Sequence, residues 1–261
     1  MKLPVLAAPF FSLFVLLPFG TADAQLRPEP GDLLWSQEIG EQIWAPLTHH
    51  DGVLYFGADD STFYAFDIEA RDVKWRFHTG GIIRSGAEVV DEHVVFASDD
   101  GFLYSLELDS GKEFWRFNLG SAGFERGLPA IDPPYSYDYR HSSPLNRGGV
   151  IYVGSASGIL YAIYDDTGLE FWRYQTEGPI RSTPVADGEN IVFGSQDGHV
   201  YSVDAMQGTL TWRFDTGGLV QGAAAIGAGK VFAGSRSARV FAVDAGTGEQ
   251  QWQHVNEDGS W

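Results

Sequence analysis

The chain has 261 residues, no cysteine and a formal net charge of −18. A charge this negative argues against a nucleic-acid partner, because proteins bind the phosphate backbone with basic surfaces. The absence of cysteine excludes disulfides, and it excludes a lipid attached to a cysteine after a leader segment.

The first residues have the composition of a secretory signal peptide. Lys2 precedes a long apolar run, and the small residues Ala22 and Ala24 follow it, so we expect cleavage after residue 24. Removing residues 1–24 takes away one basic and one acidic residue, which leaves the net charge at −18. An uncleaved membrane anchor is the alternative, although three prolines interrupt the run. We therefore expect residues 25–261 to be secreted or periplasmic and soluble.

Six tryptophans recur at a nearly constant spacing along the rest of the chain. Successive gaps are 40, 40, 57, 40 and 40 residues, and a glycine precedes four of the tryptophans by four residues. A fixed period of this size indicates stacked supersecondary units. The six residues are Trp35, Trp75, Trp115, Trp172, Trp212 and Trp252.

Each unit is predicted to contain four short strands. In the fourth unit, β-rich runs at 181–186, 190–195, 199–204 and 210–215 are separated by turn sequences. Four strands in roughly 40 residues are typical of a propeller blade. We therefore predict an all-β propeller with five complete blades and an additional N-terminal outer strand at Asp32–Trp35. The blades are expected at residues 36–75, 76–115, 116–172, 173–212 and 213–252.

Three segments that end in tryptophan, "SLELDSGKEFW", "AIYDDTGLEFW" and "AVDAGTGEQQW", resemble the docking motif of PQQ-like repeats. Such repeats occur in quinoprotein dehydrogenases and in non-enzymatic BamB-like outer-membrane assembly factors. The resemblance spans residues 35–252 and implies that each tryptophan docks against the neighbouring blade. The docking residues are then Trp75, Trp115, Trp172, Trp212 and Trp252. The counterparts that the motif implies are the small residues Ala65, Ser105, Ala162, Ser202 and Ala242.

The resemblance implies two classes of function. We expect a non-enzymatic scaffold that binds a protein or peptide in the cell envelope, without a catalytic residue, metal or cofactor. The alternative is a fragment or degenerate relative of a PQQ-dependent alcohol dehydrogenase, with quinone and calcium. Those enzymes carry an adjacent cysteine pair over the quinone, and this chain has no cysteine. A second alternative is a binder of a small ligand or sugar at the mouth of the central channel, because propellers have many functions.

The candidate binding residues form a column nine residues after each tryptophan, once a 17-residue excess is removed from the third unit. The column lies where the chain enters the innermost strand, so we expect it to surround the channel mouth. Two arginines and a histidine there would form a site for an anion or carboxylate. The alternative is that each arginine pairs with a nearby acid. The column comprises Trp44, Arg84, His141, Arg181 and Gln221.

The excess in the third unit falls at residues 124–140 and is expected to form a loop on the same face as the channel mouth. Its aromatic side chains are suited to protein contact. The alternative is a lid that closes the channel without binding any partner. The residues expected to bind are Tyr135, Tyr137, Tyr139 and Arg140.

The repeat count predicts a ring that does not close. Residues Asp32–Trp35 supply only an outermost strand, and the next innermost strand would start at Trp261. We expect either a truncated chain or assembly with a second copy or a partner that completes the propeller. A closed ring of five blades is the alternative.

Overall fold

The computed structural model describes residues 33–120 and 141–255. The chain divides into two compact units, Met1–Glu38 and Ile39–Trp261, and every described strand belongs to the second unit. Residues 33–38 are not in a strand, so the outer strand expected at Asp32–Trp35 is wrong for its described part. A strand requires a hydrogen-bonded neighbour, and no described strand pairs with this segment. In the described ranges, no helix is long and apolar enough to cross a membrane.

The second unit contains five sheets of four strands. The first comprises β1 (Thr48–His50), β2 (Val53–Gly57), β3 (Thr62–Asp67) and β4 (Asp72–His78). The second comprises β5 (Glu88–Val90), β6 (His93–Ala97), β7 (Phe102–Glu107) and β8 (Glu113–Asn118). The third comprises β9 (Leu145–Arg147), β10 (Val150–Gly154), β11 (Ile159–Tyr164) and β12 (Glu170–Gln175). The fourth comprises β13 (Val185–Asp187), β14 (Asn190–Gly194), β15 (His199–Asp204) and β16 (Leu210–Asp215). The fifth comprises β17 (Ala225–Gly227), β18 (Lys230–Ser235), β19 (Arg239–Asp244) and β20 (Gln250–Val255).

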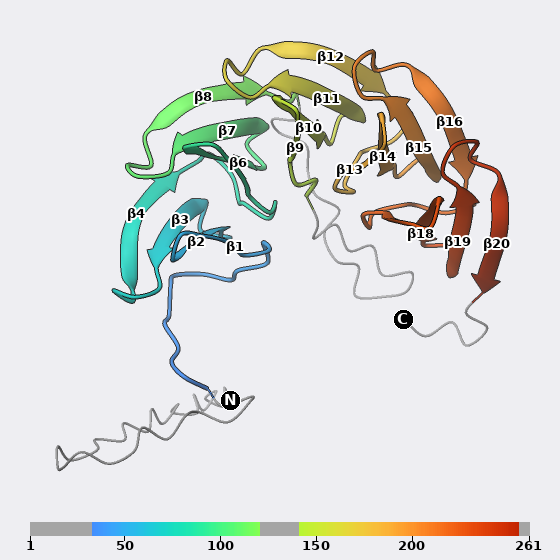
Figure 1. Cartoon of the computed structure of the whole chain (residues 1–261). Helices are drawn as coiled ribbons and strands as arrows, with labels where there is room; N and C mark the ends of the chain where they lie inside the picture. Colours follow the sequence, from blue (N-terminus) through green and yellow to red (C-terminus); the bar gives the residue numbers. More distant parts are fainter. Residues whose placement is uncertain (1–32, 121–140, 256–261) are drawn as a thin grey trace, which may run out of the picture. The chain divides into compact units, whose positions relative to one another are not determined.

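Each sheet is one propeller blade. Its strands pair antiparallel in chain order, and the blades follow one another along the chain (Figure 1). The predicted propeller class is therefore confirmed. The innermost strands are shorter than predicted, since the run at 181–186 becomes a strand only at Val185.

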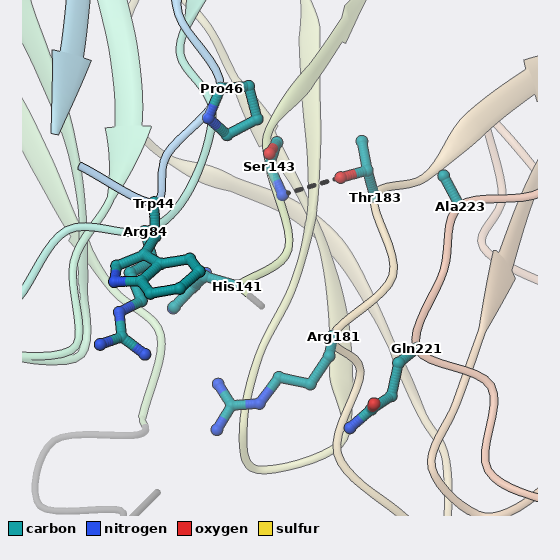
Figure 2. Close-up of a pocket in the computed structure, with 9 residues that line it drawn as sticks. All are labelled: Trp44, Pro46, Arg84, His141, Ser143, Arg181, Thr183, Gln221 and Ala223. Carbon is teal, nitrogen blue, oxygen red and sulfur yellow. Dashed lines mark hydrogen bonds between the residues drawn. The ribbon is translucent and has the colours of Figure 1, made fainter. Parts of the chain in front are cut away.

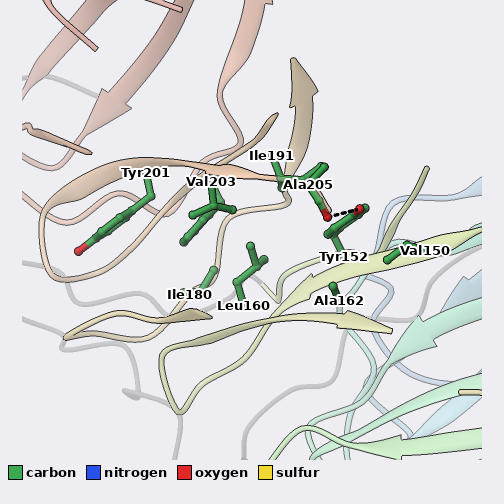
Figure 3. Close-up of a cluster of buried hydrophobic side chains, with 10 residues drawn as sticks. Val150, Tyr152, Leu160, Ala162, Ile180, Ile191, Tyr201, Val203 and Ala205 are labelled. Atoms are coloured by element: carbon green, nitrogen blue, oxygen red, sulfur yellow. Dashed lines mark hydrogen bonds between the residues drawn. The ribbon is translucent and has the colours of Figure 1, made fainter. Parts of the chain in front are cut away.

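The core lies between the blades. Four clusters of buried hydrophobic side chains each join two consecutive blades. Between the third and fourth blades, Tyr152 and Leu160 pack with Ile180 and Val203 (Figure 3). Each blade has too few residues to bury its own apolar faces, so the stability of the fold depends on contacts between neighbours.

The ring of blades is not closed. Among the described residues, no buried cluster joins the fifth blade to the first. The strand β20 is exposed along its whole length, and Trp252 is 45% exposed. The expectation of an incomplete ring is confirmed, and the alternative of a closed five-bladed ring is wrong.

Four tryptophans form the joints between blades. The indole N–H of Trp75 donates to the carbonyl oxygen of Leu108 in the next blade at 2.8 Å, and that of Trp212 donates to Ala245 at 2.8 Å. Trp115 and Trp172 make the equivalent bonds. Each indole also covers a glycine of the next blade. A Cβ at Gly168, for example, would lie 2.7 Å from Cδ2 of Trp115, and Gly168 has a positive φ of 67°.

The small residues that the docking motif implies were expected to contact the tryptophan of a neighbouring blade. They lie instead opposite the tryptophan of their own blade. Ala162 lies opposite Trp172, and Ser202 lies opposite Trp212, on adjacent strands of the same sheet. The register shifts directly after each small residue, which marks a β-bulge at the tryptophan. In the neighbouring blade, each indole therefore covers the turn that contains the glycine four residues before the next tryptophan.

We expect the fold to lose stability at alkaline pH. Burial and a hydrogen bond to Asp100 raise the pKa of Tyr104, and burial and the equivalent bond to Asp197 raise that of Tyr201. A raised pKa in the folded state stabilises it below the ordinary tyrosine value of about 10, and this contribution is lost as the pH rises above that value.

Urea unfolding between pH 8 and pH 11 tests this. The free energy of unfolding should fall above about pH 10. The variant Tyr201→Phe should reduce that dependence, because it removes one titrating group. An equal slope in the variant and the parent would contradict the expectation.

Candidate functional site

All five residues of the predicted channel-mouth column line one cavity (Figure 2). Its volume is about 420 Å³. The cavity lies where the chain enters successive blades, before each innermost strand. The lining residues are Trp44, Pro46, Arg84, His141, Ser143, Arg181, Thr183, Gln221 and Ala223.

The entry segments are anchored by the residue that precedes the column. Ile180 is fully buried, and its backbone N–H donates to the carbonyl oxygen of Ser155 in the preceding blade at 2.9 Å. Its side chain fills the space over Gly154, where a Cβ would lie 2.2 Å from the Cγ2 of Ile180. Successive residues of an extended segment point in opposite directions. The burial of Ile180 in the joint therefore directs Arg181 toward the cavity.

Arg84 is held by an acid of the preceding blade. Its Nε donates to Oδ1 of Asp59 at 2.9 Å, and its Nη2 donates to Oδ2 at 2.6 Å. Both side chains are largely buried, and the guanidinium carbon lies 5.9 Å from the ring centre of Trp44. This bidentate geometry makes a strong charge-assisted pair. The alternative that an arginine pairs with a nearby acid is therefore what the structure shows for Arg84.

His141 has a related environment. Its Nε2 lies 3.8 Å from Oδ1 of Asp99, also an acid of the preceding blade. Its Nδ1 lies 2.9 Å from the carbonyl oxygen of Ser142, and it is the donor there, because a carbonyl only accepts. The two acids follow the second strand of their blades, in the acidic pairs that the sequence indicates as turns.

The residue at the position of Asp59 differs from blade to blade. Asp59 lies 25 residues before Arg84, and the residue 25 before Arg181 is Ala156. The residue 25 before Gln221 is Gln196. The blades that precede Arg181 and Gln221 thus supply no carboxylate at the position of Asp59.

Two hydroxyl groups form a chain of hydrogen bonds along the cavity. The backbone N–H of Gly86 donates to Oγ of Ser143 at 2.8 Å, and the N–H of Ser143 donates to Oγ1 of Thr183 at 3.2 Å. Neither hydroxyl was predicted from the sequence. They occupy the column two residues after the predicted one, so the alternation of an extended segment was the available signal.

The other predicted binding residues lie outside the described residues. These are Tyr135, Tyr137, Tyr139 and Arg140, within the insertion at 124–140. The predicted cleavage after residue 24 also falls there. In the ranges 33–120 and 141–255, no three His, Cys, Asp or Glu side chains are grouped so that they could hold a metal ion.

The sequence matches one family model, which is described as outer membrane protein assembly factor BamB. The match covers residues 19–127 and 99–259. No curated protein matches the chain.

Several solved structures share the fold. BamB from Moraxella catarrhalis has a TM-score of 0.68 and 18% identity, over 82% of this chain and 62% of that one. The computationally designed Ika8 protein has a TM-score of 0.62 and 16% identity, over 80% and 61%. Quinohemoprotein alcohol dehydrogenase from Comamonas testosteroni has a TM-score of 0.65 and 14% identity, over 82% and 43%. The chain thus spans less than two thirds of each of these structures.

Proposed function

The chain belongs to the family of outer membrane protein assembly factor BamB, and on this premise we propose that it is a non-enzymatic scaffold of the cell envelope. The proposed scaffold binds a protein or peptide partner. The predicted signal peptide at residues 1–24 supports a location outside the cytoplasm. The family of assembly factors supports a role in joining other proteins.

The observation that carries the proposal is the cavity at the channel mouth. It is concave, and polar side chains from several different blades meet in it. Arg181 is only 3% exposed, and the segment that bears it is anchored in a joint between blades. A pocket with a few convergent polar groups on rigid supports is the usual form of a binding site.

The alternative of a quinoprotein dehydrogenase has less support. The similarity to the alcohol dehydrogenase is one of fold, at 14% identity. The chain lacks the cysteine pair that the resemblance implies for the enzymes. Calcium takes six to eight oxygen ligands, whereas the described ranges group no three acidic or histidine side chains for a metal. We therefore propose a scaffold that works without a cofactor.

Site-specific crosslinking tests the binding role. A photoreactive p-benzoyl-phenylalanine at Gln221, which lines the cavity, should give a discrete crosslinked protein in intact cell envelopes. The matched control carries p-benzoyl-phenylalanine in place of Met206, which is exposed on an outer turn. This control should not give the crosslinked product. Equal products from both positions, or none from Gln221, would contradict the proposal.

An activity assay tests the alternative. The purified protein, supplied with pyrroloquinoline quinone and calcium, should show no oxidation of alcohols by an artificial electron acceptor. Turnover above the rate of quinone and calcium alone would overturn the non-enzymatic assignment.

A further inference from the structure

The joints between blades share one aliphatic contact. In the joint between the first and second blades, Ile83 lies over Gly57 and takes the space that a Cβ on this glycine would need. Ile83 is fully buried, and its backbone N–H donates to the carbonyl oxygen of Ala58 at 3.2 Å. We call the aliphatic side chain the inserting residue and the glycine the receiving glycine. Two other joints repeat the contact, with the pairs Ile180 over Gly154 and Val220 over Gly194.

The fifth blade has a receiving glycine that no described residue covers. A Cβ at Gly234 would meet nothing within 4 Å, and Ser235 after it has the repeat position of Ala58. On the same face, Trp252 lies beside Phe232, with their ring centres 5.9 Å apart, and Trp252 is 45% exposed. This face therefore carries the residues of a joint, but no described blade lies over them.

The first blade has an inserting residue that is exposed. Ile43 has the repeat position of Ile83, 40 residues before it. The carbonyl oxygen of Gln42 accepts from the N–H of Asp59 at 3.0 Å, and the entry segments of the second, fourth and fifth blades make the equivalent bond. The backbone that bears Ile43 is therefore placed as in those blades. Ile43 is nevertheless 41% exposed, whereas Ile83 is fully buried.

These two surfaces are complementary. Ile43 is an isoleucine like those that insert in the joints within the chain, and Gly234 is a glycine like those that receive them. The two surfaces do not meet within one copy, since Ile43 is exposed and the space over Gly234 is unfilled. Exposed apolar surface of this kind marks a site of protein contact. A second copy of the chain supplies the missing half of each surface.

We propose that copies of this chain join head to tail, with Ile43 of one copy inserted over Gly234 of the next. The N–H of Ile43 then donates to the carbonyl oxygen of Ser235, and Trp252 lies against the outer turn of the first blade. Because the inserting residue and the receiving glycine are on different blades, the contact is heterologous and copies add in a row. The inference goes beyond the proposed function, since Ile43 and Gly234 do not line the cavity at the channel mouth.

One residue makes this contact weaker than the joints within the chain. In those joints each indole covers a glycine, and a Cβ there would lie 2.6 to 2.7 Å from the indole. The first blade instead has Arg71 at this position, four residues before Trp75, with a positive φ of 53°. Its side chain prevents Trp252 of another copy from packing as closely as Trp212 packs on Gly248. We therefore expect association that is reversible and depends on protein concentration.

Analytical ultracentrifugation of the purified protein, from micromolar to millimolar concentrations, tests the inference. The mean mass of the parent should rise with concentration. Gly234→Val fills the receiving position with a residue that favours strands, and Ile43→Asp puts a charge on the inserting residue. Each should weaken association about tenfold or more, because the joint loses a buried aliphatic side chain. Leu169→Asp, at an exposed aliphatic residue of the third blade, is the control and should associate as the parent does.

Mixing the two variants tests the head-to-tail geometry. Ile43→Asp keeps the receiving glycine, and Gly234→Val keeps the inserting residue. An equimolar mixture should therefore form a heterodimer, although neither variant associates with itself. Arg71→Gly should strengthen the association of the parent about tenfold, because Trp252 of another copy then meets a glycine.

A parent that stays monomeric at every concentration would overturn the inference, and so would a mixture of folded variants that contains no heterodimer. Circular dichroism checks the fold of each variant. If Gly234→Val does not fold, the comparison of Ile43→Asp with Leu169→Asp decides, and equal association of these two would overturn the inference. A photoreactive residue in place of Trp252 that captures another protein, but no second copy, would assign this face to a different partner and overturn it as well.

Discussion

Replacement of Trp212 by alanine is expected to destabilise the protein by about 3–5 kcal/mol, the usual cost of removing a large buried aromatic side chain. Trp212 is 6% exposed and packs on the turn at Gly248 of the next blade. Its indole N–H donates to the carbonyl of Ala245, which the substitution would leave without this donor. Trp115→Ala removes the equivalent contacts with Gly168 and Asp165 and should cost a similar amount.

The chain contains a matched control for this substitution. Trp252 occupies the same repeat position in the fifth blade, but it is 45% exposed and its indole makes no hydrogen bond to another described residue. Trp252→Ala should therefore cost about 1 kcal/mol or less. Chemical denaturation of the three variants measures the difference. Equal losses for Trp212→Ala and Trp252→Ala would show that the indoles do not act through the joint between blades.

Replacement of Gly194 by alanine should be the second most damaging change. The added Cβ would lie 2.2 Å from Cγ1 of Val220, a buried residue of the next blade. The backbone of Val220 is fixed by its bond to the carbonyl of Ser195, so the side chain cannot easily move away. Overpacking of this kind costs about 1–3 kcal/mol or more. Gly57 has the same relation to Ile83, where the distance is 2.1 Å.

Gly234 is the control at the equivalent position of the fifth blade. A Cβ there would meet nothing within 4 Å, and its φ is not in the left-handed region. Gly234→Ala should therefore change the free energy of unfolding by about 0.5 kcal/mol or less. If thermal and chemical unfolding showed equal losses at Gly194 and Gly234, strand propensity rather than the next blade would explain both.

The channel-mouth column was predictable because it follows from the period alone. Once the tryptophans define the repeat, residues at one offset must occupy equivalent places, and Arg84, His141 and Arg181 line one cavity. The period alone did not predict which partner each residue of the column has. Asp59 was interpreted as a turn residue, and its bidentate bond to Arg84 depends on the distance between two blades.

For the docking motif, too, the sequence predicted the residues but not the contact that they make. The sequence places a tryptophan and a small residue in each unit, but it does not say which small residue the indole covers. The structure pairs Ser202 with Trp212 inside one sheet and places Gly248 under the indole from the next blade. The contact across the joint depends on how far consecutive blades are offset, which a one-dimensional repeat does not contain.

By itself, the sequence determined the propeller class, the five blades and the column of residues at one repeat offset that lines the cavity. These features follow from a fixed period, since repeats with the same pattern form the same unit and stack in the same way. Only the tertiary structure decided that Asp59 pairs with Arg84 and that the hydroxyls of Ser143 and Thr183 join the site. It also decided that Trp252 is 45% exposed, whereas Trp212 is buried against the next blade. Those features depend on distances between side chains of different blades, and such distances are set only when the blades pack together.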